Sequence, residues 1–326
     1  MSKKASGVRS GTLAVAGALV GALLFAYTLS AAGPNVVLSG IGRIGIGFLF
    51  VLALSGIRMA VRAKAWSLCV EQNERFTFRD AFLAFVTGDA IGNITPLGAL
   101  ASESAKAILS RKNLSAAAAV SSVVLENIFY GISVAVMVVV GTLAFLLGFR
   151  PTEGALAVTS AVCAVAVVSM LVVWWLLSTQ PRVMSRFLKR DGVRNAEDHI
   201  FRFASARRDR LSQILLLEFA FHASAVTEIY LLLSLLIGTS GRTLLLSLVL
   251  ETAERIITIV FKFVPLRLGV DQAGSGLTAQ ILGLGSVTGV TLATVRTARN
   301  LFWALAGLAL LLKRGISMRA VVESSR

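Results

Sequence analysis

The chain has 326 residues, of which 56% are hydrophobic and 15% are charged, and its mean hydropathy is +0.80. A soluble globular protein of this size carries much more charge, so the composition excludes an ordinary soluble enzyme or binding module. The net charge of +15 comes from Lys and Arg that lie between apolar runs. Basic residues there hold short loops on the cytoplasmic side of a membrane, and nucleic acid is therefore excluded as a partner.

Six apolar runs are long enough to cross a bilayer, which takes about 20 helical residues. Basic residues lie in the loops after the second run, before the third run and after the sixth run. The loop at Gly33-Pro34, between the first two runs, has no charge. Because basic loops stay in the cytoplasm, we expect both chain ends there. The six runs are Gly11 to Leu29, Val36 to Ile57, Leu114 to Leu147, Ala155 to Leu177, Leu211 to Ile237 and Thr291 to Leu312.

Two further segments are interrupted by a proline and are predicted to be re-entrant helical hairpins, at 80–112 and 243–285. The first breaks around Pro96 and has basic residues at both ends, which places both ends in the cytoplasm. The second breaks from Pro265 to Gly274 and enters from the opposite face, because three crossings intervene. The residues expected at the two tips are Pro96, Gly98, Pro265 and Gly269.

The two interrupted segments follow the same pattern. Each has an apolar helix, a proline, a turn with glycine, a polar residue seven positions after the proline (Glu103 and Gln272), a second helix and a long crossing. One unit used twice in opposite orientation is an inverted repeat, and we predict an all-α polytopic membrane protein of this kind. It forms a single membrane domain, 1–326, with a first half at 1–178, a basic cytoplasmic linker at 179–210 and a second half at 211–326.

Polar and charged side chains at membrane depth are the candidates for substrate binding, because a charged group there is costly unless it is paired or hydrated. Static ion pairing is the alternative for the charged residues, and capping of the broken helix is the alternative for Asn93 and Thr95. The candidates are Asn93, Thr95, Glu103, Lys106, Glu126, Glu251, Arg255, Lys262, Arg267, Asp271, Gln272, Arg296 and Arg299.

Two pairings follow from position. Glu126 lies 30 residues after Pro96 and Arg296 lies 31 after Pro265, so we hypothesise that Glu126 pairs with Arg296 or with Arg299. Glu218 and His222 lie one helical turn apart, and a buried hydrogen-bonded pair is favoured over a proton relay.

Cysteine and histidine do not point to redox or metal chemistry. Cys69 and Cys163 are far apart, and His199 and His222 lack the spacing of metal ligands. The sequence also lacks a nucleophile–base constellation and a phosphate-binding loop. We expect no cofactor, no metal and no enzymatic activity.

Several stretches resemble the flippase-like transmembrane domain family of lysylphosphatidylglycerol synthases, whose relatives include hopanoid-associated membrane proteins. They are Phe76 to Phe82, Asn93 to Pro96 with Glu103 and Lys106, and Pro265 to Asp271. The resemblance covers nearly the whole chain and implies a lipid-translocating domain in the inner (plasma) membrane of a bacterium. In the synthases a soluble aminoacyl transferase domain follows; this chain stops at Arg326, so aminoacylation of lipid is not expected.

The leading hypothesis is a flippase-like transporter that moves an amphipathic lipid, with an anionic headgroup or of hopanoid or isoprenoid type, between leaflets. A secondary transporter of a small soluble solute and a non-transporting membrane scaffold stay open as alternatives. Membrane lipids are the expected partners, and a homo-oligomer and a separate lipid-modifying enzyme stay open. The family pattern also differs in places: Ala101-Ser102-Glu103-Ser104 replaces Gly-Gly-Glu-Pro, Asn127 follows Glu126 in place of Arg, and Gln272 stands where relatives often have a carboxylate.

Overall fold

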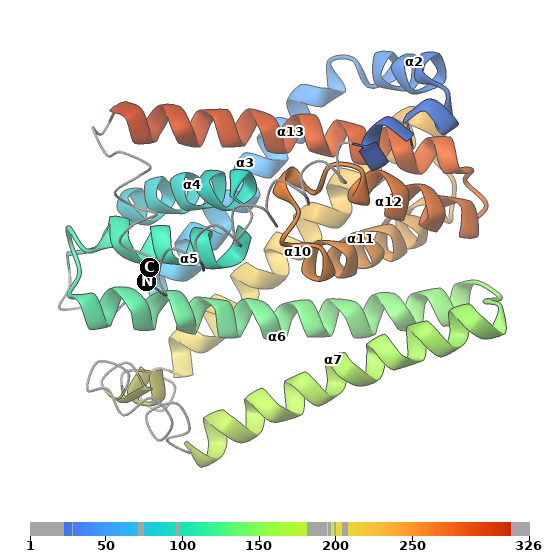
Figure 1. Ribbon diagram of the computed structural model, residues 1–326. Coiled ribbons are helices and arrows are strands. Elements are labelled where there is room, and N and C mark those ends of the chain that lie inside the picture. The colour runs from blue at the N-terminus through green and yellow to red at the C-terminus, as the bar shows by residue number, and fades with distance from the viewer. Residues whose placement is uncertain are drawn as a thin grey trace, which may run out of the picture. The chain divides into compact units, whose positions relative to one another are not determined.

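The computed structural model describes residues 23–27, 29–70, 75–95, 98–180, 194, 197–198, 200–203 and 208–313 (Figure 1). Within these ranges every regular element is a helix. The elements are α2 Pro34–Ile44, α3 Gly47–Leu68, α4 Phe78–Ile94, α5 Gly98–Ser110, α6 Ala116–Gly148, α7 Glu153–Thr179, α10 Arg208–Ile237, α11 Thr243–Val260, the 3-10 helix η1 Pro265–Arg267, α12 Val270–Ile281 and α13 Ser286–Lys313.

Four of the described helices, α6, α7, α10 and α13, are long and apolar enough to cross a membrane. A fifth span results if Leu23–Ala32 and Pro34–Ile44, which meet at an angle of 85°, are counted together. The protein is therefore an all-helical, multi-pass membrane protein. The four helices correspond to the last four expected crossings, whereas most of the first expected crossing lies outside the described residues.

The expected crossing Val36 to Ile57 is not one helix. Helix α2 ends before Gly45, which has a φ of 45°, a conformation that costs glycine little. Helix α3 then continues to Leu68 and includes Arg58 and Arg62, which had been assigned to a loop. The prediction was wrong because basic residues were taken as loop markers, whereas these two lie over aromatic rings inside the protein.

The first interrupted segment keeps its helix longer than expected. Helix α4 runs through Asn93 to Ile94, and α5 begins at Gly98, which has a φ of 40°. The side chain of Asn93 donates to the main-chain oxygen of Asp89 at 3.0 Å, and that of Thr95 donates to Ile91 at 2.8 Å. These bonds fold both side chains back onto the C-terminal part of α4. Pro96, an expected tip residue, lies outside the described residues.

The second interrupted segment breaks earlier than expected. Helix α11 ends at Val260, so Lys262 lies beyond it, and Leu266 and Arg267 have positive φ values of 51° and 50°. Helix α12 then begins at Val270, next to Gly269 with a φ of 77°. Asp271 and Gln272 therefore lie in the first turn of α12 and not in the break.

The chain divides into two compact units. The described residues of Met1–Ser55, Val86–Ser104 and Val226–Arg326 belong to unit 1, and those of Gly56–Phe85 and Ala105–Ala225 belong to unit 2. Helices α3, α4, α5 and α10 contribute residues to both units. The prediction of a first and a second half, joined at 179–210, stays a prediction, because most of that linker lies outside the described residues.

In unit 1, α12 packs against both α11 and α13 (Figure 1). Glycines allow the close approach: a Cβ atom at Gly289 of α13 would overlap with the main chain of Ser275 on α12. On the same α13, a Cβ atom at Gly307 would lie 2.7 Å from the main-chain oxygen of Val86 on α4. Small residues at such contacts are what helix packing in lipid requires, since van der Waals contact is its main source of stability.

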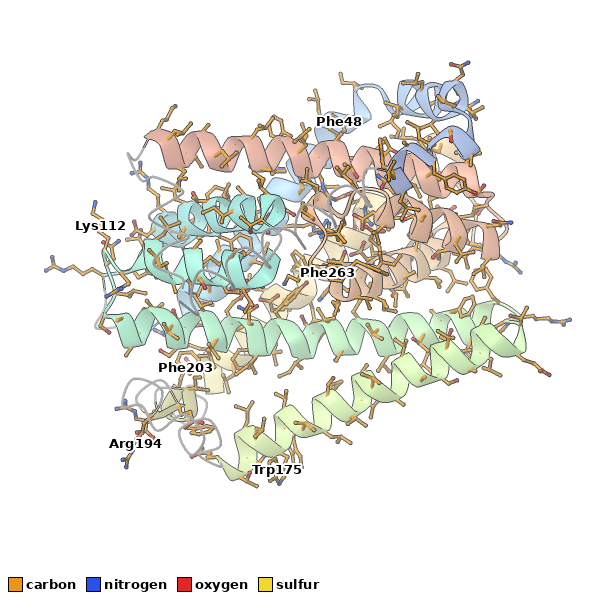
Figure 2. All side chains as sticks on the ribbon, in the orientation of Figure 1. Phe48, Lys112, Trp175, Arg194, Phe203 and Phe263 are labelled. Atoms are coloured by element: carbon orange, nitrogen blue, oxygen red, sulfur yellow. The ribbon has the colours of Figure 1, made fainter. Side chains whose placement is uncertain are left out.

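In unit 2, α6 and α7 form an antiparallel hairpin (Figure 1). Most side chains of α7 are exposed, and Trp175 lies near its C-terminal end (Figure 2). An apolar helix exposed in this way fits a lipid-facing position, with indole rings at the membrane interface. Lys112 lies in the turn that follows α5 and is exposed (Figure 2).

Candidate functional site

Six buried charged side chains from three helices of unit 1 form a group that we call the unit 1 charge cluster. Three carboxylates face three guanidinium groups, so the formal charges balance. Such a number of ionised groups inside an apolar protein requires mutual pairing, because each unpaired buried charge costs several kcal/mol. The members are Glu228 of α10, Glu251, Glu254 and Arg255 of α11, and Arg296 and Arg299 of α13.

Arg296 is the centre of the cluster and contacts all three carboxylates. Its Nη1 lies 3.4 Å from Oε1 of Glu254, its Nε lies 3.6 Å from Oε1 of Glu228, and its Nη2 donates to Glu251. One planar guanidinium therefore connects α10, α11 and α13. This use of several donors at once is a property of arginine that lysine does not share.

The other two arginines complete the network. Arg255 donates to Oε1 of Glu251 at 2.5 Å, and Arg299 donates to Glu228. The remaining donors of Arg299 bind Oδ1 of Asn300, the closer one at 2.9 Å. Glu251 thus accepts hydrogen bonds from two arginines, and Glu228 accepts one from Arg299 and forms an ion pair with Arg296.

Helix α12 is attached to this cluster by its polar residues. Oγ of Ser275 donates to Oε2 of Glu254 at 2.8 Å. Gln272, which is fully buried, accepts a bond from the main-chain nitrogen of Gly269 at 2.8 Å and donates to Oγ1 of Thr297 at 2.9 Å. The side chain of Arg267 lies 3.1 Å from the buried carboxylate of Asp271. The break before α12 is therefore held in place by side-chain bonds.

The two interrupted segments touch each other within unit 1. A Cβ atom at Gly98, the first residue of α5, would overlap with the main-chain oxygen of Lys262, just after the end of α11. Only glycine fits here, because of both this approach and its positive φ. The start of one short helix thus meets the end of another.

Unit 2 contains a second buried group of charges around Arg62. Nε and Nη2 of Arg62 both donate to Oε1 of Glu126, at 2.9 and 2.5 Å. Its guanidinium carbon lies 3.8 Å from the ring centre of Tyr130, a cation–π contact. Nζ of Lys106 lies 4.2 Å from the ring centre of Phe85. Arg62 and Lys106 are thus stabilised by rings as well as by charge.

Two predicted pairings were wrong. Glu126 pairs with Arg62, whereas Arg296 and Arg299 pair with carboxylates of α10 and α11. Glu126 and Arg296 occupy matching positions after the two prolines. Each has a nearer partner of opposite charge, so this match did not predict contact.

Glu218 and His222 are both buried as expected but do not bond to each other. Nε2 of His222 lies 3.0 Å from Oγ of Ser133 on α6, and within the described part of the chain neither oxygen of Glu218 accepts a hydrogen bond. A spacing of four residues allowed the bond, but a hydroxyl on α6 provides a partner for the histidine.

Four residues of these networks were absent from the predicted set: Arg62, Glu218, Glu228 and Glu254. The sequence contains a signal for Glu218 and Glu228, because each is an isolated acidic residue in an apolar run. Such a residue indicates a functional or a paired group. Glu103 lies on α5 and is partly exposed, and Lys262 is exposed; neither belongs to the unit 1 charge cluster.

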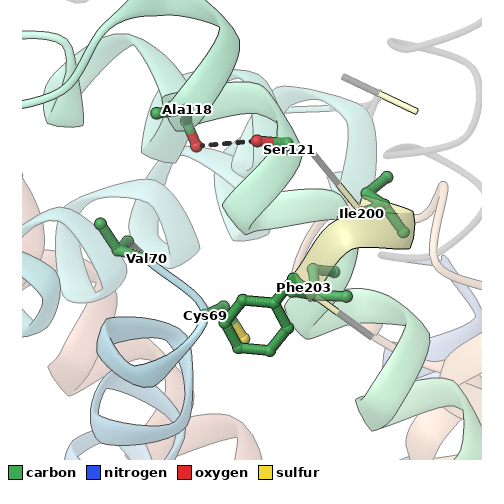
Figure 3. Close-up of a pocket in the computed structure, with 7 residues that line it drawn as sticks. Cys69, Val70, Ala118, Ser121, Ile200 and Phe203 are labelled. Carbon is green, nitrogen blue, oxygen red and sulfur yellow. Dashed lines mark hydrogen bonds between the residues drawn. The ribbon is translucent and has the colours of Figure 1, made fainter. Parts of the chain in front are cut away.

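A small pocket in unit 2 is mainly apolar (Figure 3). The hydroxyl of Ser121 in its wall donates to the main-chain oxygens of Ala117 and Ala118, at 2.8 and 3.3 Å. The polar groups of this pocket are used locally, and we do not assign it as the site. Its lining residues are Cys69, Val70, Ala118, Ser121, Leu125, Ile200 and Phe203.

The lysylphosphatidylglycerol synthase TM region family matches residues 14–307, most of the chain. The chain belongs to this family. The match includes both interrupted segments and both buried charge groups, so these features lie in a membrane domain whose family is lipid-related. The matched family is that of a transmembrane region. Neither a curated protein nor a solved structure matches the chain.

Proposed function

We propose that this member of the lysylphosphatidylglycerol synthase TM region family moves an amphipathic lipid with an anionic headgroup between the leaflets of a bacterial plasma membrane. The observation that carries the proposal is the contact of the two interrupted helices at Gly98 and Lys262, in the unit that contains the unit 1 charge cluster. Irregular backbone at membrane depth persists only inside protein or beside an aqueous cavity, and broken helices in transporters meet at the substrate site.

Basic side chains at the second break suit a phosphate headgroup. Lys262 is exposed there, and Arg267 retains 16% of its side-chain exposure beside Asp271. The break leads into the N-terminal end of α12 at Gly269, where main-chain N–H groups and the helix dipole favour an anion. A hopanoid or isoprenoid lipid with such a headgroup fits the same chemistry.

The lengths of the helices support a duplicated architecture. Helices α4, α5 and α6 have 17, 13 and 33 residues, and α11, α12 and α13 have 18, 12 and 28. We propose that the two sets are inverted copies, with re-entrant hairpins at 80–112 and 243–285 and with both chain ends in the cytoplasm.

A non-transporting scaffold is the second candidate, and the pairing in the unit 1 charge cluster favours it. Each guanidinium of that cluster contacts a carboxylate, which is typical of a static network. A scaffold would leave the leaflet distribution of every lipid unchanged. A translocating protein must change it.

A reconstitution experiment separates the two candidates. Vesicles with the purified chain and acyl-labelled phosphatidylglycerol are treated with a quencher that cannot cross the bilayer, and the wild type is expected to expose the inner-leaflet label. Arg267→Gln is expected to slow this by about tenfold or more, since a charge-assisted hydrogen bond contributes roughly 1.5–3 kcal/mol. Lys112→Gln, which removes an exposed charge after α5, is the matched control and should keep the wild-type rate. An unchanged label distribution for all lipids tried would refute the proposal.

A further inference from the structure

Unit 2 buries a carboxyl group that the proposed lipid site does not use. Glu218, in α10, has an exposed fraction of 0%, and neither of its oxygens accepts a hydrogen bond from the part of the chain that the structure describes. Its nearest cation is Arg62, whose Nε lies 4.0 Å from Oε2 of Glu218. A buried ionised carboxylate requires hydrogen bonds to replace its water, so this environment fits the neutral, protonated acid.

Arg62 lies between two carboxyl groups at unequal distances. It donates two hydrogen bonds to Glu126, the shorter at 2.5 Å, and keeps the longer distance of 4.0 Å to Glu218. The positive charge is therefore matched by Glu126. Loss of a proton from Glu218 would create a second carboxylate that competes for the same guanidinium.

Three further titratable groups near Glu218 come from three helices. Lys106 of α5 interacts electrostatically with Glu218, Arg58 of α3 lies 4.8 Å from the ring centre of Phe221, and His222 of α10 bonds to Ser133 of α6. The cations stabilise an ionised Glu218, while burial opposes ionisation. The charge that Glu218 can carry therefore depends on how close Arg62 lies, which is 4.0 Å in this arrangement.

We propose that Glu218 is a proton-binding site, and that Arg62 moves from Glu126 toward Glu218 when the proton leaves. The step converts a carboxylic acid to a carboxylate and releases one proton to water, with no other bond made or broken. As a coupling device it rests on the proposed function: lipid movement in one direction would be linked to proton movement across the membrane.

Infrared spectroscopy on the purified full chain tests proton binding without any transport assay. At neutral pH the wild type should show the carbonyl stretch of a protonated carboxylic acid, which disappears reversibly as pH rises. Glu218→Gln should remove this band, and Glu218→Asp should shift its frequency but keep it. Glu153→Gln, which removes an exposed carboxyl group at the start of α7, is the matched control and should keep the band. A wild type without the band, or the same band in Glu218→Gln, overturns the proposal.

Two further measurements distinguish a wrong proton-site proposal from a misfolded variant and from a wrong proposed function. If Glu218→Gln does not fold, the pH titration of the wild-type band and its frequency shift in Glu218→Asp decide the question. Coupling between proton binding and lipid movement is tested separately, in vesicles with an imposed pH gradient. The rate of lipid movement by the wild type should respond to the gradient, and the rate of Glu218→Gln should not. Lipid movement that ignores the gradient refutes coupling. A titrating band without lipid movement keeps the proton site and refutes the proposed function.

Discussion

Arg296 shows how one side chain can determine the packing of several helices. Its guanidinium contacts Glu228 on α10 and Glu251 and Glu254 on α11. Sliding or rotation of α13 by one residue would separate these charges in an apolar interior, where separation is costly. The ion pairs therefore fix the register of three helices, whether or not they also serve a substrate.

Arg296→Gln should lower the free energy of unfolding by about 3–5 kcal/mol, because it leaves buried carboxylates without their shared partner. The measurement is a denaturant titration of the purified chain in detergent micelles. Lys112→Gln, in an exposed turn, should change it by less than about 0.5 kcal/mol. The double variant Arg296→Gln with Glu251→Gln should lose less than the sum of the two single variants. Strict additivity would show that the pair is not coupled.

The sequence predicted most of the buried charged residues of α11 and α13, but not Glu254 and not the partners of the others. Glu251, Arg255 and Arg296 were identified because charged side chains at membrane depth must be paired or hydrated. The partner of Arg296 on α10, Glu228, is far away in sequence, and only the folded chain brings the two together. Lys262 was also a candidate at membrane depth, but α11 ends before it and its side chain is exposed.

At the scale of elements, proline and glycine marked the two interrupted segments but not the residues at which their helices end. The turn before α12 depends on Gly269, whose nitrogen binds the side chain of Gln272. A polar residue thus starts a helix where the sequence suggested an irregular tip. In the first segment, Asn93 and Thr95 bond to α4 and extend it past Gly92. Side-chain bonds of this kind cannot be deduced from residue types alone.

Gly98→Ala tests the contact between the two interrupted segments. The new methyl group would overlap with the main chain at Lys262, and the positive φ adds strain, so we expect a loss of about 2 kcal/mol or more of unfolding free energy. Gly131→Ala in α6 is the matched control: no atom lies within 4 Å of its added Cβ, and alanine should stabilise the helix by about 0.5–1 kcal/mol. Equal melting temperatures for the two variants would rule out a close contact at Gly98.

For the whole molecule, composition alone predicted a multi-pass helical membrane protein. The spans α6, α7, α10 and α13 were predicted because long apolar runs leave few other structures in a bilayer. The count of six crossings, the cytoplasmic position of both chain ends and the inverted repeat stay predictions. They depend on which side of the membrane each connection occupies.

Cysteine labelling of intact and inverted vesicles tests this architecture. A single crossing would put the two ends of an interrupted segment on opposite sides, whereas a re-entrant hairpin keeps them together. We therefore expect Arg79→Cys and Lys112→Cys to react with a membrane-impermeant maleimide only from the cytoplasmic side. Gly241→Cys and Ser286→Cys should react only from outside. All four positions are exposed.

The native thiols provide an internal control for this labelling. Cys163 of α7 is replaced by alanine, and Cys69 is kept. Cys69 follows the last residue of α3; burial raises the pKa of its thiol, and the nearby Glu126 carboxylate raises it further. Because the thiolate is the reactive form, Cys69 should stay unlabelled until the protein is unfolded. If the two members of either engineered pair react from opposite sides, that segment is a full crossing, and the inverted repeat and the carrier mechanism built on it are wrong.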